Sequence, residues 1–521
     1  YYTRALQLAG SVSGAISTLL SAHQSIGVAQ PVMLFGTEEQ KRKYLPLVAR
    51  TEISAFLLTE YDVGSDPARM SSSAVPTEDG SAYILNGLKL WTTNGVIADR
   101  LVVMAKVPRS EGHRGGISAF IVDAHSPGIT VEHRNDFMGM KGIENGVTRF
   151  ENVRVPASDL VGAEGLGLKI ALTTLNTGRL SLPAVCAAST KWALKIAREW
   201  SNEREQWGKP VGQHEAVAQK IAYIAGMAYG LESLVDVCAL MADNHDRDIR
   251  IEAALAKLFT SEMSWLAVDE LIQVRGGRGF ETAASLKARG EKPVGAEQVL
   301  RDLRINRIFE GSSEIMRLLI AREAVDAHLS VAGDIIDPEA DLQRKAAAVR
   351  KAGGFYAKWL PTLVTGAGQL PGAYAEFGSL AKHLRYAERA SRKLARTIFY
   401  AAGRWQGKLE RKQGFLGRMV DIGAELFAMS AVCVRAKKDD RPEAYELADM
   451  FCAQAQVRIG ELFTRMWHNT DDVDATFARR VMDGRYAWQE EGVLDASIPG
   501  PWIAEAEPGA SEVDNVHRTV G

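Results

Sequence analysis

Glu310 is the residue of this 521-residue chain whose neighbours best suit acid–base chemistry. It lies between Phe309 and Gly311, where a loop is expected to enter a helix that Ser312 or Ser313 could cap. A carboxylate held by apolar neighbours has a raised pKa, which suits a general base. Gly311 has no side chain, so a substrate could approach the backbone there. The segment alone also fits a solvated acid at the start of a helix, and the rest of the chain decides against that alternative.

The segment 304–317 resembles the catalytic stretch of the acyl-CoA dehydrogenases. Four other motifs follow that family's order and spacing, and they lie at 56–66, 90–95, 204–211 and 273–280. Any one of these motifs is a weak signal, whereas five in order are a strong one. The resemblance covers about residues 1–330. The segment 20–27 and the long chain after residue 330 are similar to the very-long-chain branch of the family.

The resemblance implies FAD as the cofactor and acyl-CoA as the substrate. Glu310 would remove the α-proton, and its backbone N–H, with a flavin ribityl hydroxyl, would bind the thioester oxygen. Gly311 would lie against the substrate. Trp91 would pack on the isoalloxazine ring and Thr93 would bond near N5. Four residues of the segment 56–66 would contact flavin, namely Phe56, Leu58, Thr59 and Ser65. Ser65 would also contact the substrate. Without the other motifs, Trp91 would read as a core aromatic and Thr93 as an ordinary strand residue.

Other cofactor contacts are implied across a subunit interface, which makes a homodimer the expected assembly. Arg204 would reach the pyrophosphate of the partner's FAD, with Trp207 near its rings, and Gln273 and Gly277 would line the same site. Gly277 also fits a plain loop after a helix. Ser312 and Glu314 are expected near the cofactor, and Asn176 and Arg179 form the pair that the family uses for CoA. A helix-surface arginine is the alternative for Arg179.

Some residues depart from the family pattern. Tyr61 replaces the usual proline, Val63 replaces a smaller residue, and Ser312 and Glu314 stand where threonine and glutamine or aspartate are common. None of these changes removes a reactive group, so they bear on affinity and substrate range.

The expected activity is dehydrogenation of long-chain acyl-CoA to trans-2-enoyl-CoA in fatty acid β-oxidation, with electrons passed to an electron-transfer flavoprotein. Ser21 and Ala22 are small and lie where the family has the base of the acyl pocket, so the pocket could run deep. Two alternatives stay open: an interaction or assembly protein that retains the scaffold, and a flavin acyl-CoA oxidase that uses O₂.

Bulk composition narrows the class of protein. The net charge of −2 gives no overall attraction to nucleic acid, and 46% hydrophobic with 24% charged residues is typical of a globular protein. The four cysteines are far apart and read as buried thiols of a reducing compartment, and the histidines form no metal-ligand cluster. No apolar run in the sequence reaches the length of about 20 residues that a membrane-spanning helix needs, so no such helix is expected. The expected compartment is the cytoplasm in a bacterium, or the mitochondrial matrix or inner-membrane face in a eukaryote.

Periodicity predicts a mainly α protein with a central β domain. This is the α-β-α plan of the family, with an extra C-terminal helical domain. The expected ranges are a helical domain at 1–51, a β domain at 52–160, a helical domain at 161–330, a linker at 331–339, a helical domain at 340–490 and a tail at 491–521. Compared with the family, the first helices are missing, so the N-terminal domain is expected to be incomplete. Six β-prone runs are predicted, at 53–58, 82–91, 101–105, 117–122, 129–133 and 147–153. Residues 281–298 read as a surface loop.

A basic stretch lies in the extra domain. Arg385, Arg389, Arg392 and Arg396 recur at helical spacing beside apolar residues. A basic amphipathic helix can lie on an anionic membrane, so peripheral membrane contact is one expectation. A solvated or packed face whose arginines are paired elsewhere is the other.

Overall fold

The computed structural model describes residues 1–244, 248–336, 341–495, 499–504 and 511. It forms two compact units: an N-terminal unit that runs from Tyr1 to Ile315 and a C-terminal unit that runs from Met316 to Ala504. The expected linker at 331–339 is wrong in its first part, because helix α11 (Ser313–Ile336) continues through residues 331–336. The rest of that linker, and most of the predicted tail, lie outside the described residues.

The N-terminal unit opens with short helices. They are α1 (Tyr2–Gly10), α2 (Gly14–Ser21), the π-helix η1 (Ala22–Ile26), α3 (Ala29–Phe35) and α4 (Glu38–Arg50). Thr37, which precedes two acids, caps α4: its hydroxyl accepts from the Gln40 N–H, and the Gln40 side-chain oxygen accepts from the Thr37 N–H. Single π-helical turns of this kind are frequent at functional sites.

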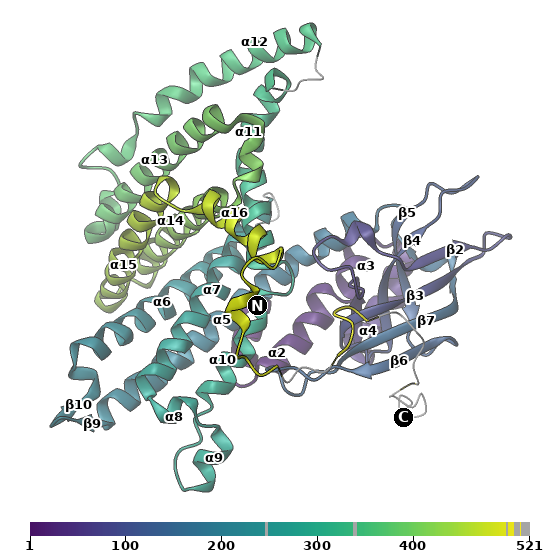
Figure 1. Ribbon diagram of the computed structural model, residues 1–521, viewed down its shortest axis with the longest axis horizontal. Helices are drawn as coiled ribbons and strands as arrows, with labels where there is room; N and C mark the ends of the chain where they lie inside the picture. Colours follow the sequence, from purple (N-terminus) through teal and green to yellow (C-terminus); the bar gives the residue numbers. More distant parts are fainter. Residues whose placement is uncertain (245–247, 337–340, 496–498, 505–510, 512–521) are drawn as a thin grey trace. The chain divides into compact units, whose positions relative to one another are not determined.

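One eight-stranded sheet follows. Its strands are β1 (Ser54–Leu57), β2 (Ser73–Pro76), β3 (Ala82–Thr93), β4 (Arg100–Val107), β5 (Gly116–Asp123), β6 (Ile129–Arg134), β7 (Asn145–Pro156) and β8 (Leu160–Val161). The strand order is β6-β7-β3-β2-β4-β5-β8, and β1 pairs in parallel with β4 (Figure 1). All six predicted runs are strands. The sequence missed β2 and β8, which are short, and β2 ends in a proline.

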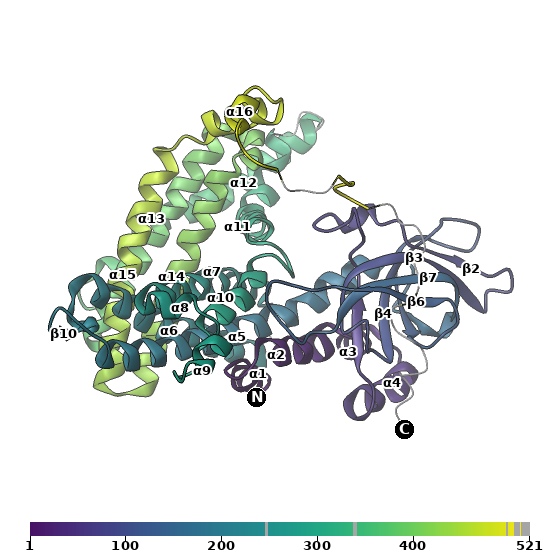
Figure 2. The same ribbon diagram turned by 60° about the horizontal axis from the view of Figure 1, so that its bottom comes forward.

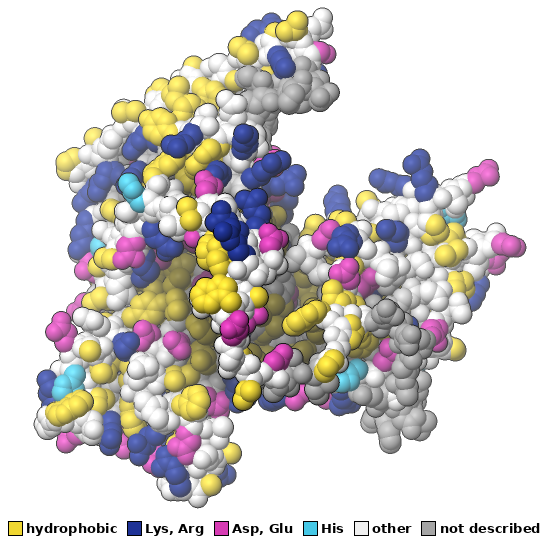
Figure 3. All heavy atoms as spheres, in the orientation of Figure 1, with side chains coloured by type: hydrophobic (Ala, Val, Ile, Leu, Met, Phe, Trp, Pro, Cys, Tyr) yellow, Lys and Arg dark blue, Asp and Glu magenta, His cyan; other side chains and the backbone are white. Residues whose placement is uncertain are grey.

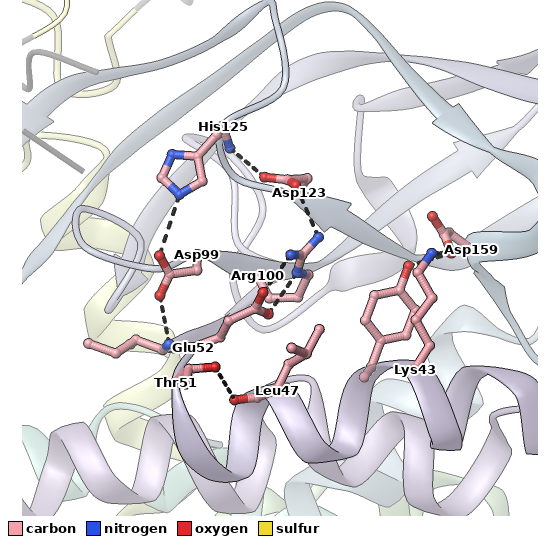
Figure 4. A network of polar contacts seen from close by, with 11 residues as sticks. Lys43, Leu47, Thr51, Glu52, Asp99, Arg100, Asp123, His125 and Asp159 are labelled. Atoms are coloured by element: carbon pink, nitrogen blue, oxygen red, sulfur yellow. Dashed lines mark hydrogen bonds and ion pairs between the residues drawn. The ribbon is translucent and has the colours of Figure 1, made fainter. Parts of the chain in front are cut away.

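A polar network ties the end of α4 to the sheet and sets where β1 starts (Figure 4). Asp99 accepts from the Ile53 N–H over 2.8 Å. Arg100 binds Glu52 over 2.7 Å and Asp123 over 3.2 Å. The pairing of Ser54 with Arg100 is thereby fixed, and β1 delivers the following loop to the edge of β3.

The rest of the N-terminal unit is a helical bundle. It contains α5 (Gly167–Glu203), α6 (Glu215–Asp243), α7 (Arg250–Arg275), α8 (Gly277–Phe280), α9 (Ala283–Ala288) and α10 (Ala296–Arg304). The expectation of a plain loop at 281–298 is wrong, because Thr282 caps α9 through the Ser285 N–H. A two-stranded hairpin, β9 (Glu205–Gln206) with β10 (Lys209–Pro210), lies at the end of the bundle away from the sheet (Figures 1 and 2).

Helix α6 is long and apolar enough, by length and composition, to cross a membrane, which the sequence reading did not anticipate. Of its most apolar stretch, 67% is buried inside the protein. The core helix of a soluble protein passes the same test, and α6 packs against α5 and α7. All four cysteines are buried and free, as expected.

The C-terminal unit is helical, as predicted, with α12 (Leu342–Trp359), α13 (Ala381–Trp405), α14 (Gln413–Asp439), α15 (Pro442–Trp467) and α16 (Asp471–Met482) after α11. In Figure 3 its Lys and Arg side chains lie among hydrophobic ones. The four predicted arginines of α13 donate to backbone carbonyls of the preceding segment. Arg385 bonds Ala373, Arg389 bonds Gly368, Arg392 bonds Thr362 and Thr365, and Arg396 bonds Leu363. The geometry therefore favours the packed alternative over a free basic face.

Candidate active site

The candidate base lies on a left-handed turn directly before α11. Glu310 has φ 52° and Gly311 has φ 91°. Two successive residues in this region are uncommon, and a non-glycine residue held there is a strained conformation of the kind that clusters at functional sites. Ser312 then accepts from the Ile315 N–H over 3.4 Å and caps the helix, while Glu314 is exposed in its first turn. The turn directs the Glu310 side chain away from the helix and toward α5.

The Glu310 carboxyl group is enclosed. Its Oε2 atom is shielded from solvent and has no hydrogen-bond partner among the described residues. A Cβ at Gly178 of α5 would overlap this oxygen, so the glycine makes room for it. Burial raises the pKa of Glu310 to about 7, although the charges of Lys257 and Arg179 oppose the shift. A carboxyl group with a pKa near neutrality is matched to proton abstraction near pH 7.

Side chains of helix α7 bind the turn that carries Glu310. Lys257 is 0% exposed, and its ammonium group donates to the Gly311 carbonyl over 2.6 Å. One turn further along α7, Glu262 accepts from Arg307 over 2.9 Å and also from the Ser313 hydroxyl. The segment from residue 307 to residue 313 is therefore fixed to α7 on both sides of the base.

Arg179 lies deeper than the sequence suggested. It is 6% exposed, and its Nη1 donates to Asn176 Oδ1 over 2.7 Å. Burial lowers the pKa of the guanidinium, and the charge of Glu310 opposes that shift. The alternative, a helix-surface arginine, is thus wrong. The pair from the family's CoA motif lies beside the base, and a role toward CoA stays a prediction.

A cluster of hydroxyl groups lies next to the base. Ser21 is 2.7 Å from Ser181 and 3.0 Å from Ser25, measured between hydroxyl oxygens. These serines surround the Tyr2 hydroxyl, whose pKa is raised by burial and, to a smaller degree, by Glu310. Ser181 also donates to the carbonyl of Gly178, the residue that faces Glu310. Ser21 is therefore small, as noted, but its side chain is engaged in this polar cluster.

The predicted flavin-contacting residues gather at the end of β3. Trp91 is 57% exposed and has φ 55°, so it is not the core aromatic of the alternative reading. The Thr59 carbonyl accepts from the Leu90 N–H over 2.9 Å, and Thr93 accepts from Asn145 over 2.9 Å. Among the remaining candidates, Phe56 and Leu58 pack against the core and Ser65 is exposed.

A buried ion pair supports this loop. Lys89 of β3 is 0% exposed and lies 2.8 Å from Glu60, which is 4% exposed. Glu60 also accepts from the N–H groups of Ser71 and Ser72 over 2.6 and 3.1 Å. Burial alone would raise the pKa of Glu60, but Lys89 and these bonds lower it to about 2. The carboxylate therefore stays charged and holds both ends of the loop from residue 60 to residue 72.

The cofactor candidates from the segments 204–211 and 273–280 lie at the end of the helical bundle away from the sheet. Arg204 ends α5 next to the β9–β10 hairpin, and Trp207 in the hairpin turn is 90% exposed. Gln273 and Gly277 are exposed where α7 meets α8. Figures 1 and 2 place this end far from β3, and Figure 3 shows exposed hydrophobic side chains beside a histidine over the hairpin. One chain thus does not bring these residues to Trp91 and Thr59.

Family models match residues 1–325, which include the N-terminal unit and the start of the C-terminal unit, in three consecutive pieces. The acyl-CoA dehydrogenase N-terminal domain matches residues 1–52, the middle domain residues 55–153 and the C-terminal domain residues 165–325. A probable acyl-CoA dehydrogenase of Mycobacterium tuberculosis, FadE10, is 65% identical over 524 residues, which cover 99% of this chain and 81% of that protein. The chain belongs to the acyl-CoA dehydrogenase family.

Other relatives agree. The human mitochondrial very long-chain specific acyl-CoA dehydrogenase is 33% identical over 88% of this chain and 70% of its own length. A Bacillus anthracis acyl-CoA dehydrogenase solved with FAD superposes with a TM-score of 0.72 at 28% identity. The superposition covers 91% of this chain and 79% of the Bacillus chain. Butyryl-CoA dehydrogenase of Megasphaera elsdenii superposes with a TM-score of 0.57 at 32% identity over 62% of this chain and 80% of its own. As a member of this family, the protein is an FAD-dependent oxidoreductase.

The residues present fit FAD. Trp91 offers an exposed ring face on a turn that its left-handed backbone holds out from the sheet. Gly64, Gly276 and Gly277 each have open space where a side chain would be, so backbone can approach a ligand there. FAD, when bound, supplies the hydride acceptor of the reaction. In that arrangement the chain would supply the aromatic face, the hydroxyl donors and the base.

Sequence reasoning missed three parts of the site: Lys257, Gly178 and Tyr2. Lys257 lies inside a regular helical pattern, where a lysine normally reads as a surface residue. Gly178 falls between the two residues of the recognised pair, Asn176 and Arg179. That glycine in a long helix, where it costs stability, was the one available signal.

Proposed function

We propose that this protein removes the α-proton and the β-hydride of an acyl-CoA thioester, with Glu310 as the base and an electron-transfer flavoprotein as the electron acceptor. The observation that carries the proposal is the enclosed Glu310 carboxyl, unpartnered at Oε2 and with a pKa of about 7. Its own backbone N–H would bind the thioester oxygen, where one such donor is worth about 3 kcal/mol. Asn176 and Arg179 would orient the thioester side, and Trp91 and Thr93 the ring that accepts the hydride.

We further propose that long acyl chains are preferred. The support is the similarity to proteins named very long-chain specific acyl-CoA dehydrogenases and the small residues at 21 and 22. Each additional buried CH₂ can contribute about 0.8 kcal/mol. The hydroxyl cluster around Ser21 is polar, so the chain-length preference is the property that most needs measurement.

Anaerobic flavin bleaching with a series of acyl-CoA thioesters tests this. We expect palmitoyl-CoA to reduce the flavin about tenfold faster than butyryl-CoA, or more, because its longer chain buries more apolar surface. Octanoyl-CoA serves as the intermediate point, and free CoA is the control for binding without chemistry. Equal or faster bleaching by butyryl-CoA would exclude the long-chain assignment but leave the dehydrogenase assignment intact.

We also propose a homodimer in which each flavin is shared. Arg204, Trp207, Gln273 and Gly277 are exposed at one end of the bundle, and Thr59 and Trp91 lie at the other. A two-fold interface would bring the bundle end of one chain to the β3 end of its partner. The large exposed ring of Trp207 fits burial in such an interface.

Complementation tests the shared site. Glu310→Gln and Arg204→Ala should each give inactive homodimers, the first for lack of a base and the second for weak FAD binding. In a mixed dimer, one of the two sites receives an intact base and an intact Arg204, so a co-expressed mixture should recover about a quarter of wild-type activity. No recovery, in dimers shown by mass to be mixed, would mean that both residues serve the same chain's flavin.

One observation favours a second candidate function. A prolyl acyl carrier protein oxidase superposes with a TM-score of 0.56 at 30% identity over 61% of this chain. Reoxidation of the bleached enzyme separates the two: rapid return of colour in air indicates an oxidase, and return only with the flavoprotein acceptor indicates a dehydrogenase. A scaffold without catalysis would not bleach.

A further inference from the structure

Lys257 is a charged residue buried beside the base, and the proposed reaction does not by itself require it. It lies on α7, is 0% exposed, and directs its ammonium group at a backbone carbonyl rather than at a carboxylate. Burying an ammonium group is costly unless it is well paired. A lysine in such a position therefore calls for an explanation in terms of what it contacts.

What it contacts is the turn that carries Glu310. The bond from Lys257 Nζ to the Gly311 carbonyl is 2.6 Å long, and Gly311 has φ 91° directly after Glu310 at φ 52°. Rotation of this peptide would release the turn and swing the carboxyl away from α5. A charge-assisted hydrogen bond is about twice as strong as a neutral one, so it can hold a strained backbone.

The charges that face the two groups are few. Glu310 faces Lys257 of α7, Arg179 of α5 and Tyr2 of α1. Lys257 faces Glu310, Arg179 and Cys186 of α5, and Glu262 on its own helix. Burial lowers the pKa of Lys257 to about 8, with Glu310 opposing that shift, and the lysine in turn lowers the pKa of the base. The ammonium form therefore prevails at neutral pH.

We propose that Lys257 is a positioning residue for the dehydrogenation: its ammonium group fixes the left-handed turn that carries Glu310 by donating to the Gly311 carbonyl. The inference rests on the proposed role of Glu310. The charge of the same ammonium group, which lowers the pKa of the base, supports it as a second effect that substitution can separate from the hydrogen bond.

Two substitutions separate these two effects. Lys257→Met removes both the donor and the charge, whereas Lys257→Gln retains a neutral donor on a side chain one bond shorter. In the wild type, the rate of flavin reduction should rise with pH through about 7 as Glu310 ionises. Both variants should move this midpoint upward by about one pH unit or more, because a neighbouring opposite charge shifts a carboxyl pKa by 1–3 units. Only Lys257→Met should also lose about tenfold or more in the pH-independent rate.

A measurement independent of turnover accompanies the kinetics. The carbonyl stretch of protonated Glu310, identified by its absence in Glu310→Gln, should titrate at the same midpoints in infrared difference spectra. Lys195→Met, which removes an exposed lysine on α5, is the matched control and should leave rate and midpoint unchanged. A wild-type pH-independent rate in Lys257→Met, or unaltered midpoints in both Lys257 variants, would overturn the inference. Full activity in Glu310→Gln would instead overturn the proposed function itself.

Discussion

Glu310→Gln is expected to retain FAD and bind acyl-CoA but to lose flavin reduction by about 10²–10⁴-fold, the usual contribution of a general base. The amide keeps the size of the side chain and the space opposite Gly178, so the geometry of the turn should survive. Stopped-flow anaerobic bleaching measures the effect. In the wild type the same rate should fall as the pH drops below about 7, because burial raises the pKa of the carboxyl to that value.

A control separates loss of the base from general damage. Glu78→Gln changes an exposed acid in the turn between β2 and β3, and it should bleach at the wild-type rate. If Glu310→Gln also bleached normally, another acid would have to remove the α-proton.

Lys89→Met is expected to lower the free energy of unfolding of the N-terminal unit by about 3–5 kcal/mol. The substitution leaves Glu60 charged and buried without its ammonium partner, beneath the loop that carries the predicted flavin contacts. Urea unfolding followed by tryptophan fluorescence measures the effect, and FAD content measures its consequence for the site.

Two comparisons sharpen this test. The double variant Lys89→Met with Glu60→Gln removes both charges but keeps an acceptor for the Ser71 and Ser72 N–H groups, so it should recover part of the loss. Arg69→Met removes an exposed ion pair with Asp62 from the same loop and should cost less than about 1 kcal/mol. Equal destabilisation by Lys89→Met and Arg69→Met would contradict the account of a buried clamp.

Much of the fold could be predicted because it depends on local pattern. Runs of β-prone residues between Gly, Pro, Asp and Ser marked the long strands such as β3 and β7, and Thr37 before two acids marked the start of α4. Strand β2 was missed because four residues ending in a proline carry little pattern, and α9 because its cap at Thr282 lay in a stretch rich in glycine and lysine. Short elements are specified by their neighbours in space more than by their own sequence.

The candidate site also has features that local sequence predicts and features that depend on neighbours in space. The position of Glu310 could be read from its motif, but its left-handed backbone could not, since only Gly311 is of a residue type that favours such a turn. Asn176 and Arg179 could be recognised as a pair from their spacing, but the burial of Arg179 beside the base could not, and a helix-surface arginine stayed open as the alternative. Which side of a long, mostly buried helix faces a site depends on packing from several directions, and no periodicity within α5 records it.

The arginines of α13 have a thermodynamic consequence for partner binding. Each of the four donates to a carbonyl of the segment from residue 362 to residue 373, so any external anion must compete with the protein's own backbone. A hydrogen bond from a charged donor contributes about 1.5–3 kcal/mol, whereas attraction to an anionic bilayer contributes about 1 kcal/mol for each basic residue. Membrane contact by this helix stays a prediction, and it would require the guanidinium groups to exchange these internal bonds for lipid phosphates. A helix can thus have the composition of a membrane-binding helix while its arginines are hydrogen-bonded within the same chain.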